Sequence, residues 1–223
     1  MRRSRTALGA LALIFAAAGR LPAQQPAADS ILDRAVAALS RARTLRADFV
    51  QQVHDPMLGT DETSSGEILR RSPGEFAMRW RRPAGDLIIV NGGVLWVYLP
   101  STAPKQAVRQ TLSGKPGESA DFVSEFLDHP RRRFAVSWLR ADSVGGRAAD
   151  VLALVPRQND VPYRRMIVWV DREDGLVRRV QIDDTGGERR TITLDHLRLD
   201  APIPASSFVF RPPRGVRVID ATE

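Results

Sequence analysis

The run of residues 66–98 constrains the fold of this chain more than any other part of the sequence. Phe76, Met78 and Trp80 lie two residues apart, so on a strand they share one face. Most half-buried strands are rich in Val and Ile, whereas Met and Trp are large and adaptable. The stripe therefore indicates either core packing or one wall of a cavity for an apolar ligand, and its spacing leaves both open.

Trp96 and Tyr98 repeat this spacing after Asn91-Gly92-Gly93, which is typical of a hairpin turn. Other runs with turn residues between them are predicted to be strands as well. These strands are Arg46–Val53, Gly66–Arg71, Glu75–Arg81, Asp86–Val90, Val94–Leu99, Lys105–Thr111, Arg133–Leu139, Ala149–Val155, Arg164–Asp171, Leu176–Ile182, Glu188–Leu199, Phe208–Phe210 and Val216–Ile219.

Helical spacing of apolar residues occurs over Asp29–Arg43 and Glu118–Leu127. Many strands with two helical interruptions predict a mainly β (α+β) fold. We expect one strongly curved antiparallel sheet that forms an incomplete β-barrel, with a helical lid over an apolar cavity.

Residues 1–23 read as a signal peptide, and residues 24–223 as a single domain. A basic head precedes the apolar run Ala7–Gly19, which is too short for a membrane span. Cleavage after Ala23 is favoured over cleavage after Ala18, and a retained anchor would need a longer run. Removing this segment takes away four arginines and no acidic residue, so the net charge falls from +7 to +3.

The remaining charges are interspersed, which argues against a nucleic-acid partner. The compact run Arg131-Arg132-Arg133 indicates either the solvated start of a strand or a patch for an acidic partner or lipid headgroup. The chain has no cysteine, so apolar burial must hold the core. It also lacks the cysteine that would anchor an exported bacterial protein to lipid.

No motif for catalysis, metal binding or cofactor binding is present. His54, His129 and His196 have no metal-ligand partner at helical spacing, and nucleophile elbows and phosphate loops are absent. The acidic loop Asp171–Gly175 lacks the later Glu of a calcium loop and reads as a hairpin. We expect no metal, no cofactor and no enzyme activity, although distant residues can assemble a catalytic set.

Several segments in order resemble the periplasmic outer-membrane lipoprotein carrier family, LolA. They are Ala47-Asp48-Phe49-Val50-Gln51-Gln52, Gly66-Glu67 with Ser72-Pro73 and Phe76, Asp86–Gly92 with Leu95-Trp96-Val97-Tyr98, and Phe208-Val209-Phe210-Arg211-Pro212-Pro213-Arg214-Gly215-Val216. The resemblance covers residues 29–218.

The resemblance implies a soluble, monomeric periplasmic carrier. Such a carrier takes acylated lipoproteins from an inner-membrane transporter, shields their acyl chains, and delivers them to an outer-membrane acceptor. The expected lipid-binding residues come from the strands, the lid and the first helix. They are Phe76, Met78, Trp80, Ile88, Trp96, Tyr98, Phe122, Phe126, Leu127, Leu32, Val36 and Leu39.

One position departs from the family. Ser72 stands where well-studied carriers have an arginine that is thought to latch the lid, and Arg71 points to the opposite face of the strand. The alternatives are a regulatory protein of the same fold that senses lipid or lipoprotein, and a carrier of glycolipid.

Overall fold

The computed structural model describes residues 27–113, 129–159 and 161–221. Within these residues the chain forms one sheet of twelve strands and little helix. The strands are β1 (Thr44–Asp55), β2 (Thr60–Arg71), β3 (Glu75–Arg82), β4 (Leu87–Asn91), β5 (Val94–Tyr98), β6 (Gln106–Thr111), β7 (Phe134–Val144), β8 (Arg147–Pro156), β9 (Tyr163–Asp171), β10 (Val177–Asp184), β11 (Arg189–Leu199) and β12 (Arg217–Ala221).

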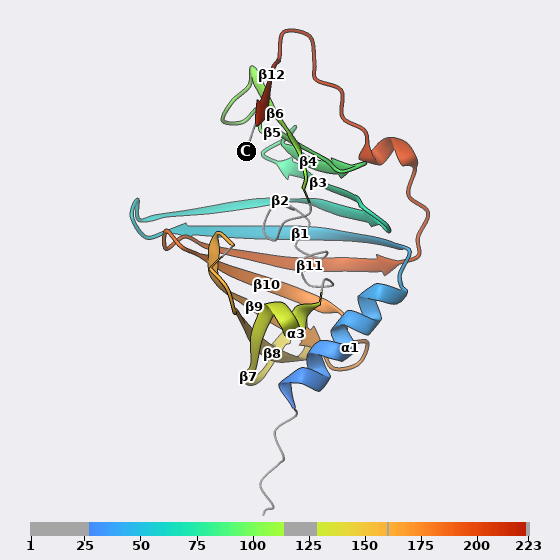
Figure 1. Cartoon of the computed structure of the whole chain (residues 1–223), viewed down its shortest axis with the longest axis vertical. Coiled ribbons are helices and arrows are strands. Elements are labelled where there is room, and N and C mark those ends of the chain that lie inside the picture. Colours follow the sequence, from blue (N-terminus) through green and yellow to red (C-terminus); the bar gives the residue numbers. More distant parts are fainter. Residues whose placement is uncertain (1–26, 114–128, 160, 222–223) are drawn as a thin grey trace, which may run out of the picture.

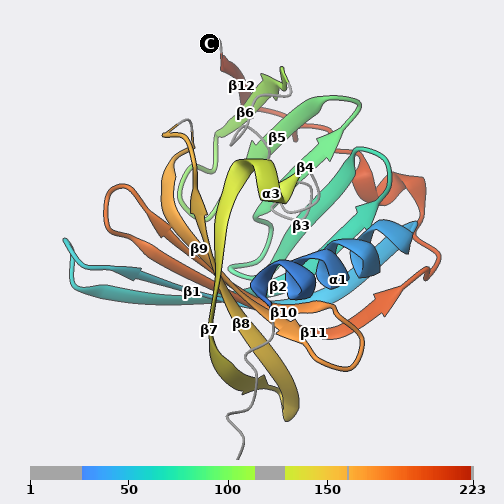
Figure 2. The ribbon, with the colours of Figure 1, turned by 60° about the horizontal axis from the view of Figure 1, so that its bottom comes forward.

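The strand order is β12-β6-β5-β4-β3-β2-β1-β11-β10-β9-β8-β7. Neighbours are antiparallel except β12, which runs parallel to β6. The sheet curves strongly and does not close, because β12 and β7 remain as its edges (Figures 1 and 2). This confirms the predicted fold class.

The sheet is built from two runs of neighbouring hairpins that meet at β1 and β11. Strands β1–β6 follow one another on one side, and β7–β11 follow one another on the other side. Antiparallel hairpins need only short turns, so each half uses local connections. The β1–β11 pair joins the halves, with Leu45 opposite Leu199.

Helix α1 (Ala28–Arg41) covers the concave face of the sheet (Figure 2). Its buried side chains are Ile31, Leu32, Ala35 and Leu39, which recur at helical spacing and form one apolar stripe. A short second helix, α3 (Pro130–Arg133), leads directly into β7. No helix among the described residues is both long enough and apolar enough to cross a membrane.

The segment after β11 differs from the prediction. Phe208–Phe210 was expected to be a strand, but the 3₁₀ helix η1 (Ala205–Phe208) and an extended stretch occupy this region. We call residues 200–216 the strap, because they cross the convex face of the sheet before β12 joins its edge (Figure 1). Phe208 and Phe210 of the strap pack on that face, so their apolar character reflects burial and not strand pairing.

Candidate functional site

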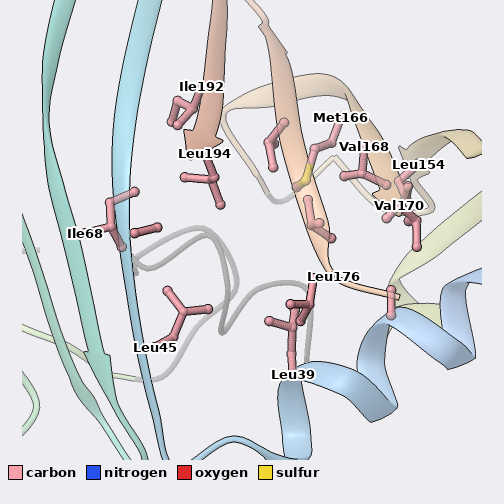
Figure 3. Close-up of a cluster of buried hydrophobic side chains, with 14 of the residues drawn as sticks. Leu39, Leu45, Ile68, Leu154, Met166, Val168, Val170, Leu176, Ile192 and Leu194 are labelled. Atoms are coloured by element: carbon pink, nitrogen blue, oxygen red, sulfur yellow. The ribbon is translucent and has the colours of Figure 1, made fainter. Parts of the chain in front are cut away.

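The concave face of the sheet is apolar from one half to the other. Strand register decides which side chains lie on it: Phe49 pairs with Leu194, and Phe76 pairs with Val90. Side chains from both halves converge with Leu39 of α1 (Figure 3). These contacts make one continuous apolar cluster, and we call its sheet side the concave face.

Most of the predicted lipid-binding residues lie in this cluster. Phe76 and Met78 are buried there, and Leu32 and Leu39 reach it from α1. Three more predicted residues are only partly buried and pack against it: Val36, Trp80 and Ile88. The structure therefore brings together seven predicted side chains from α1, β3 and β4.

Trp96 and Tyr98 are placed on the opposite face, which corrects their prediction as concave-face residues. Trp96 pairs with Ile89 and Tyr98 pairs with Leu87 across β4 and β5. All four belong to a second apolar cluster, on the convex face, where both aromatic rings pack against Phe210 of the strap. We call it the convex cluster; its other members are Leu69, Ala77, Ile203 and Phe208. The spacing shows that the two rings share a face, but it does not say which face is concave.

The concave residues of β5 are instead Leu95 and Val97. The sequence prediction also left out the wall from the other half of the sheet. That wall contains Leu152, Leu154, Met166, Val168, Val170, Val180, Ile192 and Leu194. The alternation of Ile192 and Leu194 with polar residues was a signal for this wall.

Arg70 is a charged residue on this apolar face. It pairs with Leu45 on one side and Phe76 on the other, and both partners belong to the concave cluster. Arg70 is buried, whereas Ser72 lies exposed in the β2–β3 turn, where its backbone N–H donates to the Arg43 carbonyl. The predicted lid residues Phe122, Phe126 and Leu127 lie outside the described residues, as does the predicted signal peptide.

Two ion pairs fasten α1 to its neighbours, one to β8 and one to α3. Arg34 lies 3.7 Å from the carboxylate of Asp150, and Asp33 pairs with Arg131. Asp150 is buried and also accepts hydrogen bonds from Trp138 Nε1 at 3.2 Å and Arg172 Nη2 at 2.6 Å. Arg131, from the compact basic run, thus contacts the helix that covers the concave face.

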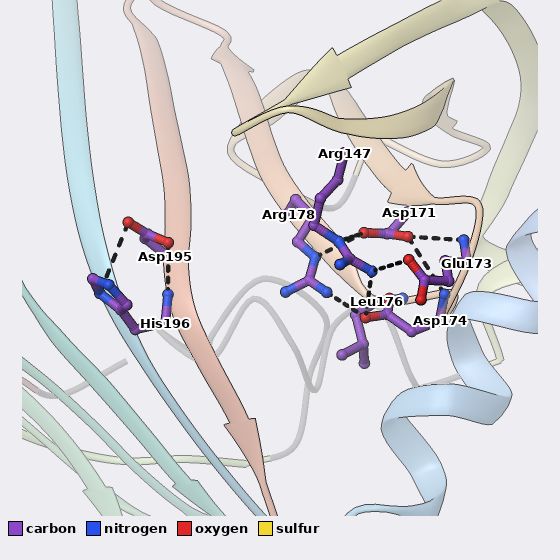
Figure 4. Close-up of polar contacts among 8 residues, drawn as sticks. All are labelled: Arg147, Asp171, Glu173, Asp174, Leu176, Arg178, Asp195 and His196. Carbon is purple, nitrogen blue, oxygen red and sulfur yellow. Dashed lines mark hydrogen bonds and ion pairs between the residues drawn. The ribbon is translucent and has the colours of Figure 1, made fainter.

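A second ionic network fixes the β9–β10 turn beside α1 (Figure 4). Burial alone would raise the pKa of Asp171, but hydrogen bonds from Arg147, from the backbone N–H groups of Glu173 and Asp174, and from Arg178 lower it to about 2. The predicted hairpin loop is confirmed here. The same turn packs Gly175 against α1, since a Cβ added at this glycine would lie 3.1 Å from the Arg34 Cγ.

Known proteins with similar sequences belong to the family that the sequence motifs resemble. The sequence model of LolA, described as "Outer membrane lipoprotein carrier protein LolA", matches residues 40–211. The outer-membrane lipoprotein carrier protein of Bordetella pertussis is 29% identical over 229 residues, covering 98% of this chain and 99% of that protein. The carrier protein of Chromobacterium violaceum is 26% identical over 196 residues, covering 87% of this chain and 89% of that protein.

Two solved structures share the fold. An uncharacterized conserved protein from Thermus thermophilus has a TM-score of 0.56 at 14% identity, covering 87% of this chain and 99% of that chain. The Pseudomonas aeruginosa MucA/MucB complex has a TM-score of 0.51 at 16% identity, covering 86% of this chain and 63% of that chain. At these identities the likeness concerns the fold alone.

Proposed function

The chain belongs to the LolA family of outer membrane lipoprotein carriers, and from this premise we propose that it carries lipoproteins by binding their acyl chains on the concave face. Its route would run through the periplasm, from an inner-membrane transporter to an outer-membrane acceptor. The continuous apolar cluster between α1 and both halves of the sheet supports this proposal most directly.

The chemistry of the cargo explains why such a face is needed. Each CH₂ group moved from water into an apolar site gains about 0.8 kcal/mol, so an acyl chain does not cross water unaided at a useful rate. The carrier must also release its cargo. Partly buried side chains such as Val36, Trp80 and Ile88 can repack around a chain more readily than fully buried ones.

Adjacent residues on β5 give a matched test. Val97 packs on the concave cluster and Trp96 on the convex cluster. We expect Val97→Gln to weaken the binding of an apolar fluorescent probe about tenfold, because it places an amide where an acyl chain would lie. Trp96→Gln should leave probe affinity unchanged while lowering stability. Equal effects of both variants on probe affinity would contradict binding on the concave face.

Native mass spectrometry of protein isolated gently from its own cells identifies the cargo. A bound triacylated lipoprotein supports the carrier, and a bound free lipid or glycolipid shifts the function toward lipid transport. Protein that carries no acyl chain and cannot be loaded with one contradicts the proposal.

We also propose that Arg70 hydrogen-bonds the carbonyl groups of an acylated cargo. A guanidinium has five N–H donors, which suit the ester and amide carbonyls that join acyl chains to a lipoprotein. Its position beside Phe76 puts these donors at the apolar face itself.

A regulatory protein of the same fold that senses lipid or lipoprotein is the second candidate, since the same apolar concave face would bind the lipid. Deletion separates the two functions. Loss of a carrier leaves many lipoproteins in the inner membrane, whereas loss of a sensor changes transcription and leaves lipoprotein location unaltered.

A further inference from the structure

The hairpin between β1 and β2 ends in two large apolar residues that face solvent. Met57 is 86% exposed and Leu58 is 74% exposed, which are the highest values among the exposed large apolar residues of the described chain. They occupy the turn Pro56-Met57-Leu58-Gly59, which we call the tip. Single exposed apolar residues are normal on a protein surface, but two adjacent ones at the end of a hairpin are candidates for contact with another apolar phase.

The tip stands clear of the body of the protein. The first four residues of β2, 60–63, are all exposed, so the end of the hairpin extends beyond the packed part of the sheet (Figure 1). His54 and Asp61 face each other across its stem, with 2.8 Å between Nδ1 and Oδ1. The β1–β2 turn is therefore the outermost part of the described protein on that side of the molecule (Figure 1).

The backbone of the tip is held in shape. One carboxylate oxygen, Oδ1 of Asp55, accepts hydrogen bonds from the N–H groups of Met57 at 2.8 Å and Leu58 at 3.1 Å. Gly59 closes the turn with a positive φ of 64°. The β10–β11 turn supports Pro56, because a Cβ added at Gly187 would lie 3.4 Å from the Pro56 Cγ. Presenting the two side chains thus costs little further ordering.

Other hairpin turns of this chain are built differently. The β9–β10 turn is Arg172-Glu173-Asp174-Gly175, the β10–β11 turn ends in Gly186-Gly187, and the β7–β8 turn is Gly145-Gly146. These polar or glycine turns are what solvent-facing hairpins usually carry. The β1–β2 tip differs from these turns because it carries two large apolar residues.

We propose that the tip is a membrane-contact device that inserts Met57 and Leu58 into the interface of a lipid bilayer. A protruding tip with two apolar residues can bury far less surface than the roughly 800 Å² per partner of a stable protein interface. A fluid bilayer, in contrast, can surround a small protrusion on all sides. The stem carries acidic Asp61 and Glu62 close to Arg189. The contact is therefore driven by apolar insertion into zwitterionic lipid and not by attraction to anionic headgroups.

The contact is weak and reversible. A single myristoyl chain binds membranes only marginally, and two side chains bury less. A protein with such a tip binds a bilayer briefly, which orients its concave face relative to the membrane, and then dissociates. This inference concerns the outside of the protein and stands apart from acyl-chain binding.

The absence of cysteine allows a clean test. Thr60→Cys, next to the tip, is labelled with an environment-sensitive fluorophore, and Ser206→Cys in the strap is the distant control label. Phosphatidylcholine vesicles should shift the emission of the Thr60 label to the blue in both low and high salt. They should leave the Ser206 label unchanged.

Substitutions distinguish vesicle binding by the tip from nonspecific binding by other exposed apolar residues. M57S/L58S should lower vesicle partitioning at least about tenfold. L139S/V209S, which removes two apolar residues that are 41% and 48% exposed elsewhere, should leave it unchanged. Three results overturn the inference: no shift, an equal shift in M57S/L58S, or a shift seen only with anionic vesicles at low salt. Apolar-probe binding should stay normal in M57S/L58S, so failure of the tip is distinguishable from failure of the concave face.

Discussion

Phe49 meets Trp80 edge-on, with ring centroids 5.5 Å apart and an angle of 84° between the ring planes. This contact links β1 to β3 across β2, where Gly66 lies between them in the sheet. A Cβ added at Gly66 would lie 2.8 Å from the Phe49 ring and 2.0 Å from the Arg79 carbonyl oxygen. The aromatic contact therefore depends on a residue without a side chain.

Gly66→Ala is expected to destabilise the protein by about 3 kcal/mol or more, because the added methyl group meets backbone as well as a ring. Urea unfolding followed by tryptophan fluorescence measures the loss. Gly186→Ala is the matched control, since its Cβ would lie 3.4 Å from the Asp184 Oδ1 and the φ there is not positive. A loss below about 1 kcal/mol for Gly66→Ala would show that β3 can move away.

Phe210→Ala is expected to cost about 3 kcal/mol, because it removes the ring that packs on Trp96 and Tyr98. Val209→Ala, half exposed in the same strap, should cost less than about 1 kcal/mol. Thermal unfolding compares the two. Probe affinity should be the same in both variants at temperatures where they are folded, and a selective loss of affinity in Phe210→Ala would assign the strap to the binding site.

Arg70→Leu and Arg71→Leu form an adjacent pair on opposite faces of β2. Arg71 pairs with Glu75 and lies over the Phe208 ring, on the convex face. We expect Arg70→Leu to weaken the binding of a diacylated lipopeptide about tenfold and to leave a carbonyl-free apolar probe unaffected. Arg71→Leu should change neither affinity. Titration of both ligands checks this, and equal loss of both in Arg70→Leu would mean that Arg70 acts through packing.

Acid is expected to destabilise the β9–β10 turn within a defined window. The pKa of Asp171 is lowered to about 2 in the folded protein, from 3.8. The unfolded chain therefore binds this proton first as the pH falls, so the stabilisation is complete above about pH 4 and is lost on going down to about pH 2. It amounts to on the order of 2 kcal/mol. Asp171→Asn should remove that part of the pH dependence of unfolding, and an unchanged acid limb would contradict the assignment.

Asp150→Leu is expected to destabilise the protein by about 3 kcal/mol, because it leaves Trp138 Nε1 and the Arg172 guanidinium without their acceptor. Asp33→Asn, at an ion pair in which both side chains are more than half exposed, should cost less than about 1 kcal/mol. Hydrogen exchange should show faster exchange in α1 for Asp150→Leu. Unchanged exchange there would mean that apolar packing alone holds the helix.

Sequence patterns were sufficient for most strands of the sheet and for α1, because local alternation and helical spacing report burial directly. They were insufficient for β5, where Leu95, Trp96, Val97 and Tyr98 are all apolar and both faces are covered. Alternation disappears from a strand buried on both sides, and the cover over Trp96 comes from Phe210, far along the chain. Only the register of β4 and β5 settles which face is concave.

The tip was missed for a different reason. Residues 60–65 are polar and mostly exposed, so they give no alternation and were not recognised as strand. Pro56 and Gly59 are residue types common in turns, and they were the available sequence signal for the end of this hairpin. The extension of the hairpin follows from pairing with β1, as in Asp55 opposite Thr60, and pairing is not encoded in the local pattern.

The pairing of β1 with β11 sets the order in which this protein can mature. Each half of the sheet can form from hairpins of neighbouring strands, but the pairing of Leu45 with Leu199 joins residues separated by most of the chain. Contacts of such high sequence separation form slowly, because the loop must close before any contact offsets the lost entropy. Until that seam closes, the two apolar walls remain separate and exposed. The proposed lipid-binding face is therefore expected to form late in folding, and a newly made chain is expected to need protection from aggregation until then.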